Sequence, residues 1–214
     1  IQSQEIGFVL QSPENQVITD KVWHELAFGL ESLGYDTPTI RRRVAEVAAF
    51  FGIENWFYKN VTELSGGQKQ LLSLASVMAM SPKILVLDEP TAQLDPIAAS
   101  EFLALIGKIN RELGITVILT EHRLEEAFPF ATRVIVMEDG RIVCDDTPER
   151  VGLHLRDKDS GMFLAMPTAM RVWAGLTTNL ACPLTVRDGS DFLTAREKEK
   201  PISPLAEKPD YFYG

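Results

Sequence analysis

Two adjacent carboxylates, Asp88 and Glu89, close the short apolar stretch ILVLDE. A wholly apolar run that ends in a carboxylate is typical of a strand buried on both faces, as in parallel sheets. Open α/β sheets bind ligands at the carboxyl ends of their strands, where the chain can turn and let both carboxylates serve one cleft. Asp88 can then hold Mg²⁺, directly or through water, and Glu89 can orient or deprotonate an attacking water. A solvated acidic strand end is the alternative.

A histidine and a glutamine follow two other apolar runs. His122 comes after ITVILT (115–120), a second expected buried strand, and parallel neighbours would bring it to the same sheet edge as Glu89. There it can contact a terminal phosphate and sense its loss on hydrolysis, although a lone histidine after a strand is more often a surface residue or a helix cap. Gln11 ends the first expected strand, and its amide oxygen can coordinate Mg²⁺ and contact water. Most glutamines, however, are surface residues.

The stretch LSGGQKQ (64–70) predicts a helix start that suits phosphate. Ser65 is a good N-cap residue, two glycines follow it, and bare N–H groups at a helix N-terminus attract phosphate. Yet no G-x-x-x-x-G-K-[ST] occurs in the 214 residues, so the loop and lysine that usually hold a nucleotide's phosphates are absent from this sequence. Further on, Asp95 can cap a helix that starts near Pro96.

Apolar periodicity predicts the elements that must position these side chains. Helical spacing over 22–33 and 39–51, with no clear strand, predicts a small helical subdomain at about residues 20–80. Strands alternate with helices elsewhere, which predicts an α/β fold with a mostly parallel sheet and right-handed crossovers. The expected strands are 5–10, 84–88 and 115–120; the expected helices are 71–78, 98–113 and 123–128; and 133–144 is an expected hairpin that turns at Asp139-Gly140.

We expect a core at residues 1–154 and a C-terminal extension and linker at 155–214. Periodicity weakens from about Leu155, and the stretch from Thr194 onward is rich in charge and proline, as linkers and tails are. The first expected strand begins almost at once, which is typical of a chain entered partway through a domain.

Composition restricts the classes of function. Lys and Arg total 21 against 30 Asp and Glu, and the net charge of −9 argues against a large nucleic-acid surface. The two cysteines are far apart with no C-x-x-C motif, which favours free thiols in a reducing cytoplasm. No apolar run approaches the ~20 residues needed to span a bilayer, and the start lacks a signal-peptide pattern.

Taken in order, these motifs resemble those of the ATP-binding subunit of ABC transporters. The resemblance covers roughly residues 5–151. Gln11 resembles the family's Q-loop glutamine, LSGGQ (64–68) its signature, and Asp88-Glu89 its Walker B motif. Leu94-Asp95 resembles the D-loop, and His122 resembles the H-switch histidine. The resemblance implies a P-loop-NTPase-like fold with a helical signature subdomain, and it implies ATP and Mg²⁺ as ligands.

In that family two ATPase domains meet head to tail, and each ATP lies between the Walker A loop of one domain and the signature of the other. The resemblance therefore implies that the signature residues bind the partner's ATP. The roles it implies are ATP contact for Leu64, Ser65, Gly66, Gly67 and Gln68, Mg²⁺ binding for Asp88 and Gln11, base catalysis for Glu89, γ-phosphate contact for His122 and communication across the dimer for Asp95.

One departure from the family is large. Walker A and the aromatic residue that stacks on adenine precede the Q-loop in the family, and this sequence starts after them. An N-terminally truncated fragment fits better than a degenerate ATPase, because Glu89, His122 and the signature are intact. We expect the chain as given to bind ATP poorly and to be inactive alone.

Three stretches resemble energy-coupling-factor (ECF) ATPases, namely VLQSPENQ (9–16), ELAFGLESLG (25–34) and VMAMSPKILVLDEPTAQLDPIAA (77–99). ECF transporters import vitamins or transition-metal ions through a membrane-embedded coupling protein. The stretches AQLDPIAA (92–99) and PLTVRDGSDFL (183–193) resemble those of proteins that fuse two ATPase domains in tandem. The resemblance implies a peripheral subunit on the cytoplasmic face of the cell membrane, with a second ATPase domain and an integral membrane component as partners and no nucleic acid.

The alternative is a non-transport ABC ATPase of the DNA-repair or ribosome-associated type. The first would need long heptad arms, which this sequence lacks, and the charge of −9 fits DNA poorly. The second would be expected to be more basic, for contact with rRNA.

Overall fold

The computed structural model describes residues 5–158, 161–176 and 180–199. It divides into two compact units, Ile1–Glu126 and Ala127–Gly214, and each is described here by itself. The domain boundary expected between residues 154 and 155 stays a prediction, because a compact unit and a functional domain need not coincide.

A three-stranded parallel sheet forms the centre of the first unit. The strands are β1 (Ile6–Val9), β2 (Ile84–Asp88) and β3 (Thr116–Thr120), in the order β1-β2-β3. Register places Phe8 beside Val86, and Val86 beside Ile118. The expected α/β architecture with a parallel sheet is therefore confirmed, and all three strands end at the same edge.

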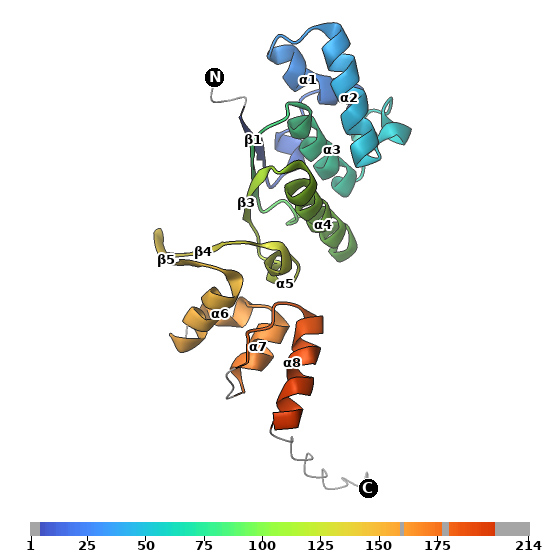
Figure 1. The fold of residues 1–214 in the computed structure, drawn as a ribbon. Helices are drawn as coiled ribbons and strands as arrows, with labels where there is room; N and C mark the ends of the chain where they lie inside the picture. The colour runs from blue at the N-terminus through green and yellow to red at the C-terminus, as the bar shows by residue number, and fades with distance from the viewer. Residues whose placement is uncertain (1–4, 159–160, 177–179, 200–214) are drawn as a thin grey trace, which may run out of the picture. The chain divides into compact units, whose positions relative to one another are not determined.

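Four helices accompany this sheet, and Figure 1 shows α3 and α4 on the same side of it. The first two, α1 (Val22–Ser32) and α2 (Thr37–Phe51), confirm the two expected helices and pack with α3 (Gly66–Ala79) as a helical subdomain. Between β2 and β3 runs α4 (Pro96–Leu113), which is ended by Gly114 in the left-handed conformation at φ +67°.

Among the described residues of this unit, helices cover one face of the sheet and leave the other face open. Leu85 and Leu87 of β2 are fully buried among apolar residues of the helices. On the opposite face Phe8 is 49% exposed and Ile118 is 54% exposed. The prediction that 115–120 is a buried strand is therefore wrong for one face, because the described helices of this unit pack on the other face.

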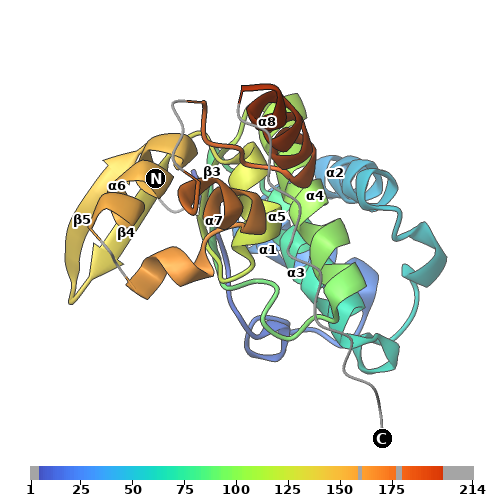
Figure 2. The ribbon, with the colours of Figure 1, turned by 90° about the horizontal axis from the view of Figure 1, so that it is seen from below.

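The described part of the second unit combines a hairpin with three α-helices. The hairpin, β4 (Val134–Glu138) and β5 (Arg141–Asp146), turns at Asp139-Gly140 as expected, with both residues at positive φ. Figure 2 shows α6 (Pro148–Asp157) beside it, and α7 (Thr168–Ala174) packs with α8 (Val186–Glu199). Cys144 and Cys182 are both free, and burial raises the pKa of the Cys182 thiol to about 12.

The expected linker is partly helical. Residues 194–199 belong to α8, so the prediction of a tail from Thr194 is wrong for that part, and residues 200–214 lie outside the described range. Thr185 and Asp188 explain the helix, since each accepts a hydrogen bond from the other's backbone N–H at 3.0 Å. This is a capping box with aspartate as its acidic partner, and Phe192 then anchors α8 in an apolar environment.

Short 3₁₀ turns complete the described chain. α5 (Leu124–Ala127) is a single turn of helix followed by a 3₁₀ turn at Phe128–Phe130, where one helix over 123–128 was expected. The other 3₁₀ turns are Pro13–Asn15, Glu54–Trp56, Val61–Glu63 and Gly161–Ala165. Over the described residues, no helix combines the length and apolar character that crossing a membrane requires.

The central strand predicts where the first unit is most sensitive to mutation. Leu85→Ala should lower the free energy of unfolding by about 3 kcal/mol, because it leaves a cavity at a fully buried position. Leu113→Ala, the same change at a half-exposed position, is the control and should cost under about 1 kcal/mol. Urea unfolding followed by circular dichroism measures both. Equal losses for the two variants would contradict this description of the core.

Candidate functional site

Glu89 leaves the sheet in an unusual backbone conformation. Its φ of +43° lies in the left-handed region, which non-glycine residues rarely adopt. The Glu89 N–H donates to both the backbone oxygen and the Oγ1 atom of Thr120, at 3.1 and 3.0 Å. Such strain costs on the order of 1–3 kcal/mol and persists where surrounding contacts enforce it. The turn after β2 is therefore held by β3.

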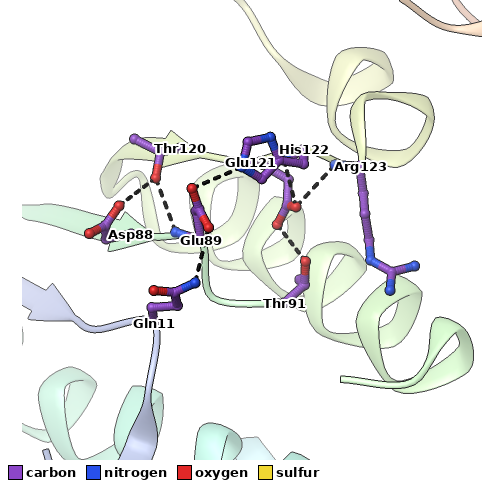
Figure 3. Close-up of polar contacts among 8 residues, drawn as sticks. All are labelled: Gln11, Asp88, Glu89, Thr91, Thr120, Glu121, His122 and Arg123. Atoms are coloured by element: carbon purple, nitrogen blue, oxygen red, sulfur yellow. Dashed lines mark hydrogen bonds and ion pairs between the residues drawn. The ribbon is translucent and has the colours of Figure 1, made fainter. Parts of the chain in front are cut away.

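The Glu89 carboxylate lies between Gln11 and His122, as Figure 3 shows. Gln11 Nε2 donates to Oε2 at 3.1 Å, and His122 Nε2 is 2.9 Å from Oε1. The three residues come from the ends of β1, β2 and β3, so the parallel sheet brings them together as the sequence predicts. His122 is 82% exposed and Glu89 34%, so the pair is open to a ligand from solvent.

Asp88 contacts a residue that sequence reasoning missed. Thr120 Oγ1 donates to Asp88 Oδ1 at 2.8 Å while it accepts from the Glu89 N–H. One hydroxyl thus joins both carboxylate residues, because β2 and β3 pair with Asp88 beside Thr120. A threonine at the end of an apolar run is common in strands, so its sequence carried no specific signal.

Glu121 and Thr91, which the sequence did not indicate as site residues, fix the position of the segment around His122. Glu121 Oε1 accepts from the backbone N–H groups of His122 and Arg123, at 2.8 and 3.0 Å. Its Oε2 accepts from the hydroxyl of the fully buried Thr91 at 2.6 Å. Glu121 therefore ties the loop after β3 to the loop after β2. A carboxylate directly before a short helix is the one signal that could have indicated this role.

The signature segment forms the start of α3. The Ser65 Oγ atom accepts from the Gln68 N–H at 3.3 Å, and Gln68 Oε1 accepts from the Ser65 N–H at 2.9 Å, a capping box that confirms Ser65 as N-cap. Leu64 is buried in the core. An added Cβ on Gly66 would meet no atom within 4 Å, so its backbone is open to close approach. Within the described chain, no hydrogen bond joins this segment to Glu89.

Asp95 caps α4, as the sequence predicts. Its Oδ1 accepts from the N–H groups of Ile97 and Ala98, both at 3.0 Å. The backbone oxygen of Leu94 accepts from Arg123 Nη2 at 3.4 Å, which links this loop to the segment that carries His122. Asp95 can cap α4 and also contact a partner domain, because both capping hydrogen bonds go to Oδ1 and neither goes to Oδ2.

The oxygen donors at the sheet edge suit Mg²⁺ in kind. Asp88 offers a carboxylate, and Gln11 has an amide oxygen on the same group whose Nε2 donates to Glu89. Over the part of the chain described, no group of three or more His, Cys, Asp or Glu side chains is placed to hold a metal ion. Mg²⁺ commonly binds one or two protein carboxylates and completes its shell with water and phosphate.

Comparison with known proteins agrees with this geometry. The family model described as ABC transporter matches residues 1–92. A putative ABC transporter ATP-binding protein of Bacillus cereus is 57% identical over 206 residues, which cover 94% of this chain and 37% of that protein. The energy-coupling factor transporter ATP-binding protein EcfA1 of Caldanaerobacter subterraneus is 47% identical over 69% of this chain and 53% of its own length. The chain thus spans about a third to a half of these two relatives.

A solved structure is similar to much of this chain. CbiO1 from Clostridium perfringens, described as part of the ABC transporter complex cbiONQ, is 34% identical, with a TM-score of 0.66. The match covers 80% of this chain and 68% of CbiO1. Because the order of the motifs, the parallel sheet that gathers them and these relatives all agree, the chain belongs to the ATP-binding proteins of ABC transporters.

Proposed function

We propose that this chain is part of the ATP-hydrolysing energy-coupling subunit of an ECF-type importer. The observation that carries the proposal is the Glu89 carboxylate held between Gln11 and His122 at the end of a parallel sheet. EcfA1 and CbiO1, to which the chain is similar, support the ECF assignment. The imported substrate would be a vitamin or a metal ion, moved by a membrane partner.

Glu89 is the general base in this proposal. Water attacks the γ-phosphorus of ATP, the bond from that phosphorus to the bridging oxygen breaks, and the water proton passes to Glu89 as ADP and phosphate form. Gln11 and His122 each hold one carboxylate oxygen, which fixes the direction in which the base points. On ATP binding, His122 exchanges this contact for one with the γ-phosphate.

Asp88 and Gln11 would hold Mg²⁺, and Thr120 would keep the Asp88 carboxylate in place. Bound there, Mg²⁺ supplies positive charge that offsets the negative charge on the phosphates. Asp88 and Glu89 then have separate roles. Beside the left-handed turn at Glu89, the Asp88 carboxylate contacts Thr120 and the Glu89 carboxylate contacts His122.

Leu64–Gln68 would bind the ATP of a second ATPase domain, packed head to tail. The N–H groups of Gly66 and Gly67 lie in the first turn of α3 and have no acceptor within the helix. They and the helix dipole favour a γ-phosphate. Asp95 would communicate across this dimer. Since no G-x-x-x-x-G-K-[ST] occurs among the 214 residues, we also propose that this stretch alone binds ATP poorly and is inactive.

Membrane attachment would come from an integral membrane component. We propose that this component holds the subunit at the cytoplasmic face of the cell membrane. The helical subdomain would face it, with Gln11 linking that region to the nucleotide site. The C-terminal region would lead to a second ATPase domain.

Glu89→Gln tests the proposed base. In the full-length protein this variant should retain ATP binding, because the amide keeps the size of the side chain. It should lose turnover by at least about 100-fold, because the amide cannot accept the water proton. Binding is measured with a fluorescent ATP analogue and turnover by phosphate release. Unchanged hydrolysis would remove Glu89 as the base.

Thr120 provides a matched pair of variants. Thr120→Val keeps the shape but removes the hydroxyl that contacts Asp88 and the Glu89 N–H, so kcat should fall roughly tenfold to a hundredfold. Thr120→Ser keeps the hydroxyl and should remain within about threefold of the wild type, as one lost methyl group affects only packing. A similar kcat for the two variants would show that the hydroxyl has no part in the site.

The transport assignment has its own test, in which the tagged full-length protein is purified from detergent-solubilised membranes. We expect an integral membrane protein and an ATPase domain to co-purify with it, whether that domain is a separate chain or fused. Purification with ribosomes or DNA and without a membrane protein would instead favour the non-transport alternative.

A further inference from the structure

We propose that Gln70 is a positioning residue that holds the peptide preceding Gln11 and so keeps Gln11 within reach of Glu89. This inference rests on the proposed ATPase function of the Glu89 site. Gln70 belongs to α3, whereas the other residues of the Glu89 site follow strands β1, β2 and β3.

Gln70 makes one hydrogen bond across a long stretch of sequence. Its Nε2 donates to the backbone oxygen of Leu10 at 3.3 Å, and the side chain is only 1% exposed. A backbone oxygen can only accept, so the contact requires the amide nitrogen of Gln70 to face Leu10. Because Gln70 is buried, water cannot easily replace Leu10 as the partner of its amide N–H.

Gln16 holds the same residue from the other side. Gln16 Oε1 accepts from the Leu10 N–H at 2.9 Å, and its Nε2 donates to the backbone oxygen of Phe8 at 3.0 Å. The pairing of β1 with β2 ends at Val9, so Leu10 is the first residue beyond the sheet ladder. Two glutamine side chains thus take the place of a strand partner for Leu10.

The next residue along the chain is Gln11, which donates to Glu89 at 3.1 Å. Gln70 lies one turn beyond the α3 N-terminus formed by Ser65 and Gly66. A continuous set of contacts therefore runs from the signature helix through Leu10 to the Glu89 carboxylate. Such continuity is a geometric link, and energetic coupling has to be measured.

The chemistry of Gln70 itself argues for a role beyond packing. Among the described residues its Oε1 has no hydrogen-bond partner, although the atom is buried. An apolar side chain of similar size would avoid this cost if filling the core were the only requirement. The amide is thus better explained by its donor to Leu10.

Gln70→Met tests the role, since it keeps length and flexibility but lacks the donor. In the full-length protein we expect kcat to fall roughly tenfold, the equivalent of one lost hydrogen bond, with KM for ATP within about twofold. Ser73→Ala is the matched control, because Ser73 is buried on the same helix and its hydroxyl has no partner in the described chain. It should leave kcat within about twofold.

A double-mutant cycle separates positioning from general destabilisation. If Gln70 acts through Gln11, then Gln70→Met should lower kcat no further in a Gln11→Ala background. The same fold-loss in both backgrounds would overturn the proposal, because the effect would then not pass through Gln11.

Hydrogen exchange without nucleotide gives a readout that does not depend on ATP hydrolysis. Gln70→Met should speed amide exchange over residues 8–12, and Ser73→Ala should not. Gln16→Met, at a partly exposed position, should release the Leu10 N–H directly and serves if Gln70→Met does not fold. Unchanged exchange in the folded variants would overturn the positioning role. If Gln70→Met exchanges faster but the wild-type protein hydrolyses no ATP, the Leu10 contact is supported while the proposed function is removed.

Discussion

The parallel pairing of β2 with β3 is the constraint on which the candidate site depends. It sets Asp88 beside Thr120, and the Thr120 hydroxyl then joins the Asp88 carboxylate to the Glu89 backbone. A slip of one residue in this register would turn every β3 side chain to the other face and break both contacts. The left-handed turn at Glu89 persists because β3 satisfies its N–H.

Side-chain amides and hydroxyls extend this order beyond the sheet. Gln16 and Gln70 form hydrogen bonds with the Leu10 backbone where the strand pairing ends. After β3, Glu121 accepts hydrogen bonds from the Thr91 hydroxyl and from two backbone N–H groups. Each of these contacts gives a hydrogen-bond partner to a polar group that lies just beyond a strand. A buried polar group without a partner would lower the stability of the fold. The segments that carry Gln11 and His122 are therefore positioned loops, although they lie outside strands and helices.

Much of the fold could be predicted from local patterns. Apolar spacing located α1 and α2, and Asp139-Gly140 located the hairpin, since these signals arise within a few residues. The prediction for β3 was wrong on one face, because burial depends on what packs there and Ile118 stays exposed. The helical part of the expected tail was missed because charge masked the Thr185–Asp188 capping box and the single buried Phe192.

By itself, the sequence determined which groups are available for chemistry and their order: Gln11, the signature at 64–68, Asp88-Glu89 and His122. It also determined their positions at strand ends and at a helix start, since periodicity and capping are local properties. Only the tertiary structure decided that Glu89 lies between Gln11 and His122, and that Thr120 and Gln70 support them. The reason is that these contacts join residues about 30 to 80 positions apart, and strand register and helix packing, rather than local spacing, set such distances.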